Sequence, residues 1–222
     1  MQVKFPNDFW WGAATSGPQT EGRFNKKHAN MFDYFYEIKP ESFYKHQGPD
    51  TASNFYNDFK NDIRLMKEAG LKTVRTSIQW SRLIDDLEKN TVNSDAVAFY
   101  NAVIDEFIAQ GITPMINLHH FDLPVELYHK YGGWESKKVV DLYAGFAEKL
   151  LNALVIASNT GSPTTNHWLS WKEAIYSNSI IQIKLMDTLL SKLLTTCNLP
   201  QAKPSQNTAR YNSMEKLGLS ST

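Results

Sequence analysis

Three polar side chains lie in or just after short apolar segments of the sequence: Gln19, Arg75 and His120. An amide and an imidazole can exchange hydrogen bonds with hydroxyl groups, and an aromatic ring such as that of Phe121 can stack on the apolar face of a sugar. These residue types, placed where apolar segments end, favour the binding of a carbohydrate.

Each of these side chains also has a purely structural interpretation. Gln19 could cap the backbone of a loop, and His120 could be a packed histidine with no ligand. Arg75 is expected either to pair with an acid or to lie at a sheet edge, because an unpaired buried charge is costly. Glu21 has the interpretation of a partner for a nearby base. Taken one at a time, these alternatives stay open.

The three apolar segments have the composition of β-strands. Residues 9–14 follow a Pro-Asn-Asp turn, residues 73–78 are rich in β-branched side chains, and residues 113–119 carry a proline at their start. We expect each segment to form a strand.

Segments with helical spacing precede two of these strands and follow the third. In residues 52–70 and 94–111, apolar side chains recur at every third or fourth position and a glycine ends the run. Ser94 or Asp95 is the expected cap of the second helix, and Ser136 that of the third. Two helix-glycine-strand units in succession indicate an α/β fold with a parallel sheet.

The composition is that of a globular protein and excludes several classes of function. The chain has 222 residues, 42% of them hydrophobic, and its 23 basic and 23 acidic residues leave no net charge. This gives no support for a nucleic-acid or anionic-membrane partner. A single cysteine, Cys197, excludes a disulfide framework and a cysteine-rich zinc site. With no secretory signal and no apolar run of membrane-spanning length, the expected location is cytoplasmic.

The character of the sequence changes abruptly near residue 150. All 12 phenylalanines lie before Leu150, and only Glu173, Asp187 and Glu215 of the 23 acidic residues lie after Lys149. The later part is instead rich in Ser, Thr, Asn and Leu. We therefore expect residues 1–149 to be one structural unit and residues 150–222 to be a tail of different origin, to which no domain is assigned.

Three motifs in the first part resemble glycoside hydrolase family 1. Residues 9–22 are similar to the family's N-terminal signature, with Pro18 in place of an aromatic residue or histidine. Residues 74–83 and 117–124 are similar to its second-strand and third-strand motifs, with Phe121 in place of tryptophan. The amino-acid sequence of the first two motifs is most similar to that of bacterial family members of the 6-phospho-β-glucosidase type.

The resemblance implies a fold, a reaction and roles for the polar residues. The fold is the N-terminal portion of a (β/α)₈ barrel, its first three βα units, with the active face at the carboxyl ends of the strands. The reaction is retaining hydrolysis of β-glucosides or 6-phospho-β-glucosides, with no metal or cofactor. Gln19 and His120 would bind sugar hydroxyls, Phe121 would line the pocket, and Arg75 would orient and ionise the nucleophilic carboxylate.

The carboxylates that perform this reaction are missing from the sequence. The family's acid/base glutamate lies in an Asn-Glu-Pro motif and its nucleophile in a Glu-Asn-Gly setting, and neither occurs here. A complete barrel has roughly 250 residues. We therefore assign no catalytic residue and expect a truncated, inactive chain. Two alternatives remain: a sugar-binding remnant without catalysis, and one half of a split barrel that needs a separate C-terminal fragment.

The genetic code offers an origin for the tail. Residues 164–168 can be encoded ACA-ACG-AAC-CAT-TGG, which in a shifted frame reads AAC-GAA-CCA-TTG, or Asn-Glu-Pro-Leu. The same frame shift, applied from Leu150, permits codons for further amino-acid segments that are typical of the family. The sequence thus predicts that residues 150–222 are an out-of-frame translation of a family 1 gene.

Overall fold

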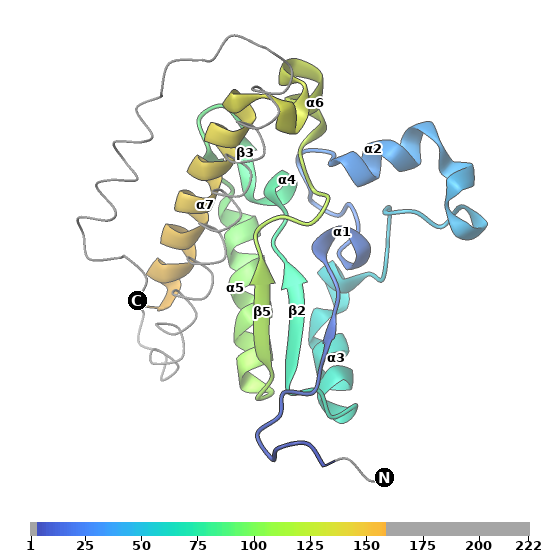
Figure 1. Ribbon diagram of the computed structural model, residues 1–222, viewed down its shortest axis with the longest axis vertical. Helices are drawn as coiled ribbons and strands as arrows, with labels where there is room; N and C mark the ends of the chain where they lie inside the picture. The colour runs from blue at the N-terminus through green and yellow to red at the C-terminus, as the bar shows by residue number, and fades with distance from the viewer. Residues whose placement is uncertain (1–3, 159–222) are drawn as a thin grey trace. The chain divides into compact units, whose positions relative to one another are not determined.

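The computed structural model of the chain describes residues 4–158. Their centre is a parallel sheet of three strands: β1 (Gly12–Ala14), β2 (Thr73–Ser77) and β5 (Thr113–Asn117), in the order β1-β2-β5. The three predicted strands and the parallel sheet are therefore confirmed. Figure 1 shows the arrows of β2 and β5 pointing in the same direction.

The strand register places the carboxyl ends of the three strands at one edge. Ala14 is paired with Arg75, and Arg75 with Met115. Ser77 and Asn117 close the longer ladder. The residues that follow each strand therefore lie at the same end of the sheet.

Long helices return the chain from one strand to the next and bury the sheet. α3 (Phe55–Glu68) precedes β2, and α5 (Ser94–Ala109) precedes β5. They form one apolar cluster with β2, in which Ile63 and Phe107 are fully buried. α7 (Lys137–Ser158) belongs to a second apolar cluster, which it shares with α5 and the segment after β2.

Glycines end α3 and α5, as the sequence predicts. Gly70 and Gly111 have φ values of +82° and +69°, which favour glycine because other residues are strained there. The predicted cap of α5 is wrong by one or two residues. Asn93 is the cap, because its extended backbone lets its side chain accept a hydrogen bond from the N–H of Ala96 at 2.7 Å. Ser94 is the first residue of the helix.

The first strand is shorter than predicted, and the aromatic residues ahead of it pack on one another, while the carbonyl oxygen of Trp11 accepts a hydrogen bond from the N–H of Lys72 at 2.8 Å. The rings of Phe5, Phe9 and Trp11 lie with their centroids 4.7–4.8 Å apart. Trp10 is 60% exposed. Strand pairing begins only at Gly12.

Several short elements follow the strands and were not expected from periodicity. They shape the edge where the strands end (Figure 1). The helices are α1 (Gly17–Thr20), α2 (Met31–Ile38), α4 (Trp80–Leu83) and α6 (Val125–Tyr131); β3 (Ile84–Asp86) and β4 (Thr91–Val92) form an antiparallel pair; and η1 (Pro40–Ser42), η2 (Tyr44–His46) and η3 (Gly133–Glu135) are 3₁₀ turns.

The boundary predicted near Lys149 falls inside α7, which continues to Ser158. The rest of the predicted tail, residues 159–222, lies outside the described residues. Cys197 and the predicted out-of-frame phrase at 164–168 also lie outside them. The division at residue 149 stays a prediction.

Among the helices within residues 4–158, none is both long enough and apolar enough to cross a bilayer. The cytoplasmic location stays a prediction. In the same part of the chain, no group of three or more His, Cys, Asp or Glu side chains is placed to hold a metal ion.

Candidate functional site

Three of the predicted binding residues, Gln19, His120 and Phe121, follow strands at the carboxyl end of the sheet, and the fourth, Arg75, lies within the central strand. Gln19 is on α1, directly after β1, and Arg75 is the middle residue of β2. His120 and Phe121 lie in the turn that follows β5. The parallel order of the strands thus brings together residues that are up to 102 positions apart in the sequence.

Arg75 connects the ends of β1 and β5. Its Nη1 donates a hydrogen bond to the carbonyl oxygen of Thr15 at 2.8 Å and lies 3.4 Å from Nδ1 of His120. The expectation that Arg75 pairs with an acid or lies at a sheet edge is wrong for the described residues. Its strand is the central one, its partners are a carbonyl and an imidazole, and its half-buried position leaves the charge partly solvated.

The contact with Arg75 sets the protonation of His120. A guanidinium has only donors, so Nδ1 of His120 must accept and the ring proton lies on Nε2. Burial and the positive charge of Arg75 lower the pKa of His120, against the opposing charge of Asp122. His120 is therefore a neutral imidazole at neutral pH, with an Nε2–H that can donate to a hydroxyl group.

Gln19 and Phe121 present their side chains to solvent. The hydroxyl of Ser16, which is itself buried, donates to Oε1 of Gln19 at 2.6 Å and fixes the side-chain amide. Phe121 is 71% exposed, and the edge of its ring lies against His120 with centroids 5.0 Å apart. An amide, an imidazole and an exposed ring are thus available at one edge, as the sequence predicts for sugar binding.

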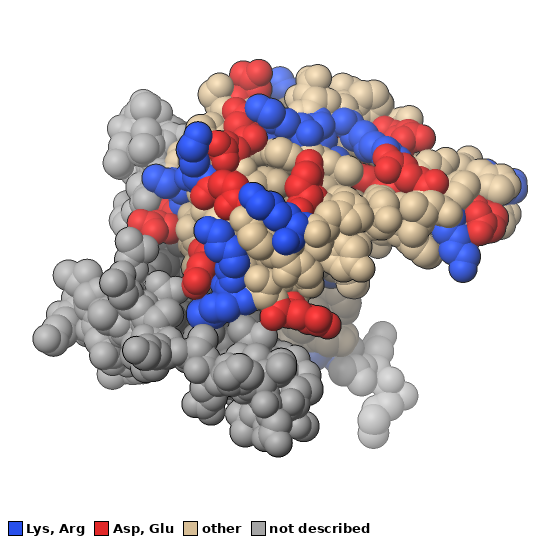
Figure 2. All heavy atoms as spheres, turned by 90° about the horizontal axis from the view of Figure 1, so that it is seen from above, with Lys and Arg blue, Asp and Glu red and all other residues tan. Residues whose placement is uncertain are grey.

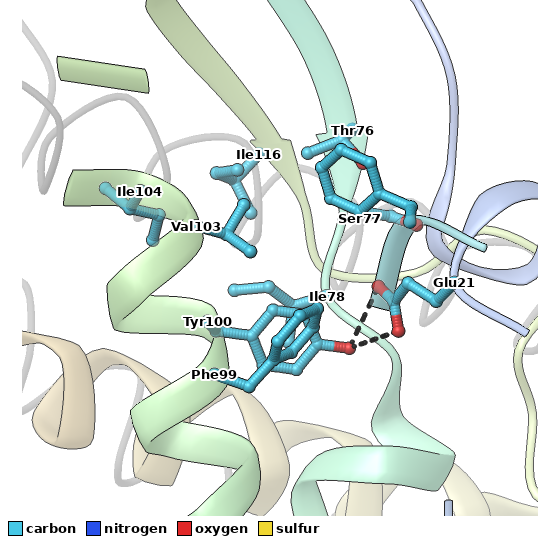
Figure 3. A pocket seen from close by; sticks show the side chains of 10 residues that line it. Glu21, Thr76, Ser77, Ile78, Phe99, Tyr100, Val103, Ile104 and Ile116 are labelled. Carbon is cyan, nitrogen blue, oxygen red and sulfur yellow. Dashed lines mark hydrogen bonds between the residues drawn. The ribbon is translucent and has the colours of Figure 1, made fainter. Parts of the chain in front are cut away.

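Glu21 is a buried partner of a base and not a reactive group. Its carboxylate accepts from Nε2 of Gln79 at 2.7 Å and from Nε of Arg82 at 2.7 Å. The hydroxyl of Tyr100 lies 3.1 and 3.2 Å from its two oxygens, as the dashed lines in Figure 3 show. Burial raises the pKa of Glu21, and the charge of Arg82 opposes this. The structural interpretation of Glu21 is therefore the one that the contacts support.

A small cavity lies next to Glu21, between the sheet and α5 (Figure 3). It has a volume of about 10 Å³, and apolar side chains such as Val103 and Ile116 line most of it. A space of this size holds at most a single water molecule. It is a packing void, and the predicted sugar-binding residues lie outside its lining.

The family assignment follows from comparison of the whole sequence. The family model described as glycosyl hydrolase family 1 matches residues 1–179. The chain belongs to this family. Two bacterial relatives are the 6-phospho-beta-glucosidase GmuD of Bacillus subtilis, 48% identical over 148 residues, and the 6-phospho-beta-glucosidase AscB of Escherichia coli, 31% identical over 188 residues.

Solved structures of family 1 enzymes share the fold of the described residues. The family 1 β-glucosidase from Thermotoga maritima is 33% identical, with a TM-score of 0.62, over 68% of this chain and 34% of that one. The predicted fold class, the first part of a (β/α)₈ barrel, is confirmed. The alignment with GmuD covers 66% of this chain and 31% of GmuD. The alignment with AscB covers 76% of this chain and 37% of AscB. The chain therefore spans about a third of the length of these relatives.

The family 1 motifs contain buried polar residues that the sequence did not single out. They are Gln79, Arg82 and Asp122, which lie within the second-strand and third-strand motifs. All three are buried, and each makes a hydrogen bond to a residue that follows a different strand of the sheet. A charged or amide side chain within an apolar motif is the signal that could have identified them.

Residues 26–28 form a basic cluster whose charges are paired with nearby acids. Lys26 is nearly buried and pairs with Asp33, while Lys27 lies 3.3 Å from Asp85. Figure 2, which views the molecule over the strand ends, shows basic and acidic side chains interspersed over this face. These lysines are therefore matched by local acids.

His28, the last residue of this cluster, has a hydrogen-bond acceptor next to each of its two ring nitrogens. Its Nδ1 lies 2.9 Å from the carboxylate of Glu126, and its Nε2 lies 3.1 Å from the carbonyl oxygen of Asp85. Both partners only accept, so both ring nitrogens must carry protons. Burial lowers the pKa of His28 and Lys27 adds to this, but Glu126 and the Asp85 carbonyl outweigh them and the pKa is raised.

We expect the chain to lose stability as the pH rises above about 6.5, the ordinary pKa of histidine. Since the folded pKa of His28 is raised, its contribution is complete below that value and disappears as the pH passes the folded value. The loss is about 1 kcal/mol or less, because Glu126 is half exposed. Urea unfolding at pH 6 and pH 8.5 measures it. His28→Gln should flatten the dependence relative to the unchanged chain. Equal slopes in the two chains contradict the prediction.

Proposed function

We propose that residues 4–158 form the sugar-binding sector of a β-glycosidase site, specific for a β-glucoside or a 6-phospho-β-glucoside. The observation that carries the proposal is the bridge made by Arg75 to Thr15 and His120 at the carboxyl ends of the strands. It joins the polar residues of all three family motifs at the edge where (β/α)₈ enzymes bind their substrates.

Each side chain has a role that its surroundings support. The Nε2–H of neutral His120 donates to a sugar hydroxyl, and the fixed amide of Gln19 contacts a neighbouring hydroxyl. The exposed ring of Phe121 covers an apolar sugar face. Arg75 has no carboxylate partner among the described residues, which leaves its charge for the nucleophile of a complete site.

Hydrolysis itself is not expected of this chain alone. Retention requires a nucleophile and a proton donor about 5–5.5 Å apart. Glu21 and Asp122 are the carboxylates nearest to Gln19 and His120 in sequence, but both are fully buried and hold hydrogen-bond donors. The Asn-Glu-Pro motif is missing from the sequence. We therefore assign no catalytic residue.

Calorimetry and a rate assay on the full chain test this proposal together. We expect weak binding of cellobiose, glucose or glucose 6-phosphate, and no hydrolysis of aryl β-glucosides in plain or 6-phosphorylated form. His120→Ala should weaken binding about tenfold or more, the effect of losing one hydrogen bond to a neutral group. His129→Ala, which removes an exposed histidine of α6 that is not among the predicted site residues, is the control. Hydrolysis by the pure chain contradicts the predicted inactivity. Equal sugar affinities of the His120→Ala and His129→Ala variants contradict the proposed binding site.

The two bacterial relatives favour 6-phospho-β-glucosides over plain glucosides, because both carry that substrate in their names. The same calorimetry discriminates between them. Tighter binding of glucose 6-phosphate than of glucose supports the phosphorylated substrate, and equal binding supports the plain one.

A complementary C-terminal fragment is a second proposal, and the open edges of the sheet favour it. Within the described residues β1 and β5 each pair on one side only, and Trp11 and Met115 are about half exposed. Unpaired edges and exposed apolar side chains are what a missing remainder of the barrel covers. Hydrolysis that appears only on co-expression with the remaining two thirds of a family 1 chain supports it, and inactivity of the mixture counts against it.

The out-of-frame origin of residues 150–222 is proposed from the genetic code alone. Sequencing the source gene tests it directly. Codons for Asn-Glu-Pro in the alternative frame at residues 164–168 are expected, and codons that exclude this reading end the proposal.

A further inference from the structure

Asp122 is a fully buried carboxylate in the turn after β5, and its two oxygens hold two separate segments of the chain. Oδ1 accepts from the backbone N–H of His120 at 2.7 Å, and Oδ2 accepts from the backbone N–H of Trp80 at 2.6 Å. Oδ1 also lies 3.0 Å from Nδ1 of His119. Because Trp80 begins α4 just after β2, one side chain joins the ends of two neighbouring strands.

These contacts favour the ionised carboxylate. Both backbone groups are donors, and an ionised carboxylate accepts through both oxygens, whereas a protonated carboxyl carries an O–H donor and has less acceptor capacity. Burial raises the pKa of Asp122, but His119 and the two backbone N–H groups outweigh it, so the pKa is lowered. Asparagine at this position is the same size, and it replaces one acceptor oxygen with an NH₂ donor.

The turn that Asp122 closes contains a strained residue. Phe121, between His120 and Asp122, has a φ of +59°, a left-handed value that is unfavourable for a residue with a side chain. The hydrogen bond from His120 N–H to the Asp122 carboxylate spans this residue. Strain of this kind persists only when the surrounding contacts hold it. Asp122 supplies two such contacts, one to the backbone of His120 and one to the backbone of Trp80.

We propose that Asp122 is a positioning residue for His120. It fixes the strained turn, and this places the imidazole against Arg75, with Nδ1 and Nη1 3.4 Å apart. Its consequence for sugar binding rests on the proposed function. The contact between His120 and Arg75 exists without a sugar, so it can be measured independently of any ligand.

Nuclear magnetic resonance of the isotope-labelled full chain tests the proposal. In Asp122→Asn, we expect the His120 amide to exchange about tenfold faster or more, since a hydrogen bond to a charged group is lost. The nuclear Overhauser contacts between the His120 ring and Arg75 should weaken, and the His120 ring nitrogens should shift toward a mixture of tautomers. Asp95→Asn removes an exposed carboxylate at the start of α5 and should change none of these signals.

A folded Asp122→Asn chain that keeps both the His120–Arg75 contacts and the slow amide exchange overturns the proposal. If this variant fails to fold, the unchanged chain decides. There the amides of His120 and Trp80 must both exchange far more slowly than free peptide, and free-peptide exchange at His120 overturns the proposal. A chain that shows the contacts but binds no sugar contradicts the proposed function and leaves the positioning role of Asp122 intact.

Discussion

Replacing Arg82 by methionine is expected to destabilise the chain by about 3–5 kcal/mol, the cost of leaving one member of a buried ion pair alone. Arg82 is 1% exposed, and its Nε lies 2.7 Å from the carboxylate of Glu21, which is 2% exposed. Its Nη2 also donates to the carbonyl of Gly22 at 3.0 Å, and its Nη1 donates to that of Phe24. The variant leaves the buried carboxylate of Glu21 without its cation, with only the neutral donors Gln79 and Tyr100, and takes the Arg82 donor from two carbonyl groups.

The aromatic surroundings of Arg82 add to this loss. The guanidinium carbon lies 4.4 Å from the ring centroid of Tyr56 and 5.6 Å from that of Phe99. A cation over an aromatic ring is stabilised by the ring's electron density, and methionine keeps the contact area without the charge. Since a domain is stable by roughly 5–15 kcal/mol, the variant should show a much lower urea midpoint or no cooperative transition.

Two matched variants separate the buried pair from a general effect of losing an arginine. Arg64 pairs with Glu68 on the exposed side of α3, and Arg64→Met should cost no more than about 0.5 kcal/mol. The double variant Glu21→Leu/Arg82→Met removes both buried charges and should be less damaged than Arg82→Met alone. An Arg82→Met chain as stable as Arg64→Met would show that water reaches Glu21.

The sheet could be predicted because its signals are local. Each strand is a short β-rich run, and Gly70 and Gly111 mark the helix ends by a backbone conformation that glycine adopts freely. Parallel order then places Gln19 and His120 at one edge without any knowledge of their contacts. The cap at Asn93 was missed because Ser94 and Asp95 are equally good caps by residue type, and only the backbone decides among the three.

The polar network behind the site could not be predicted, because its partners are far apart in sequence. Glu21 meets Arg82 across 61 positions, and Asp122 reaches Trp80 across 42. A sequence shows that a buried acid needs a partner, but it does not show which base or amide supplies one. The short helices α1 and α4 depend on these contacts, which explains why periodicity gave no sign of them.

Replacing Trp80 by alanine is the second large change, with an expected loss of about 3–5 kcal/mol. Trp80 is fully buried, and its ring centroid lies 5.5 Å from those of Tyr143 and Phe146 and 6.1 Å from that of Trp134. It thereby packs the segment after β2 against α7. Removing the ring leaves a cavity at the centre of this cluster, and the partners relax only in part.

Phenylalanine at the same position should cost far less, about 1 kcal/mol. The Nε1 of Trp80 is buried and has no hydrogen-bond partner among the described residues, so Trp80→Phe removes an unsatisfied donor together with part of the ring. The backbone N–H of residue 80 still reaches Asp122 in both variants. Trp10, which is 60% exposed, is the matched control, and Trp10→Ala should stay within about 0.5 kcal/mol of the unchanged chain.

Urea unfolding of the three variants ranks these effects, and hydrogen exchange locates them. In Trp80→Ala the amides of α7 near Tyr143 and Phe146 should exchange faster, while those of α3, which belongs to the other apolar cluster, should change little. Uniform acceleration in both helices would mean that the two clusters unfold as one. A Trp80→Ala chain as stable as Trp10→Ala would mean that α7 does not pack on the strand ends in solution, and the packing that supports His120 and Asp122 from behind would then have to be sought elsewhere.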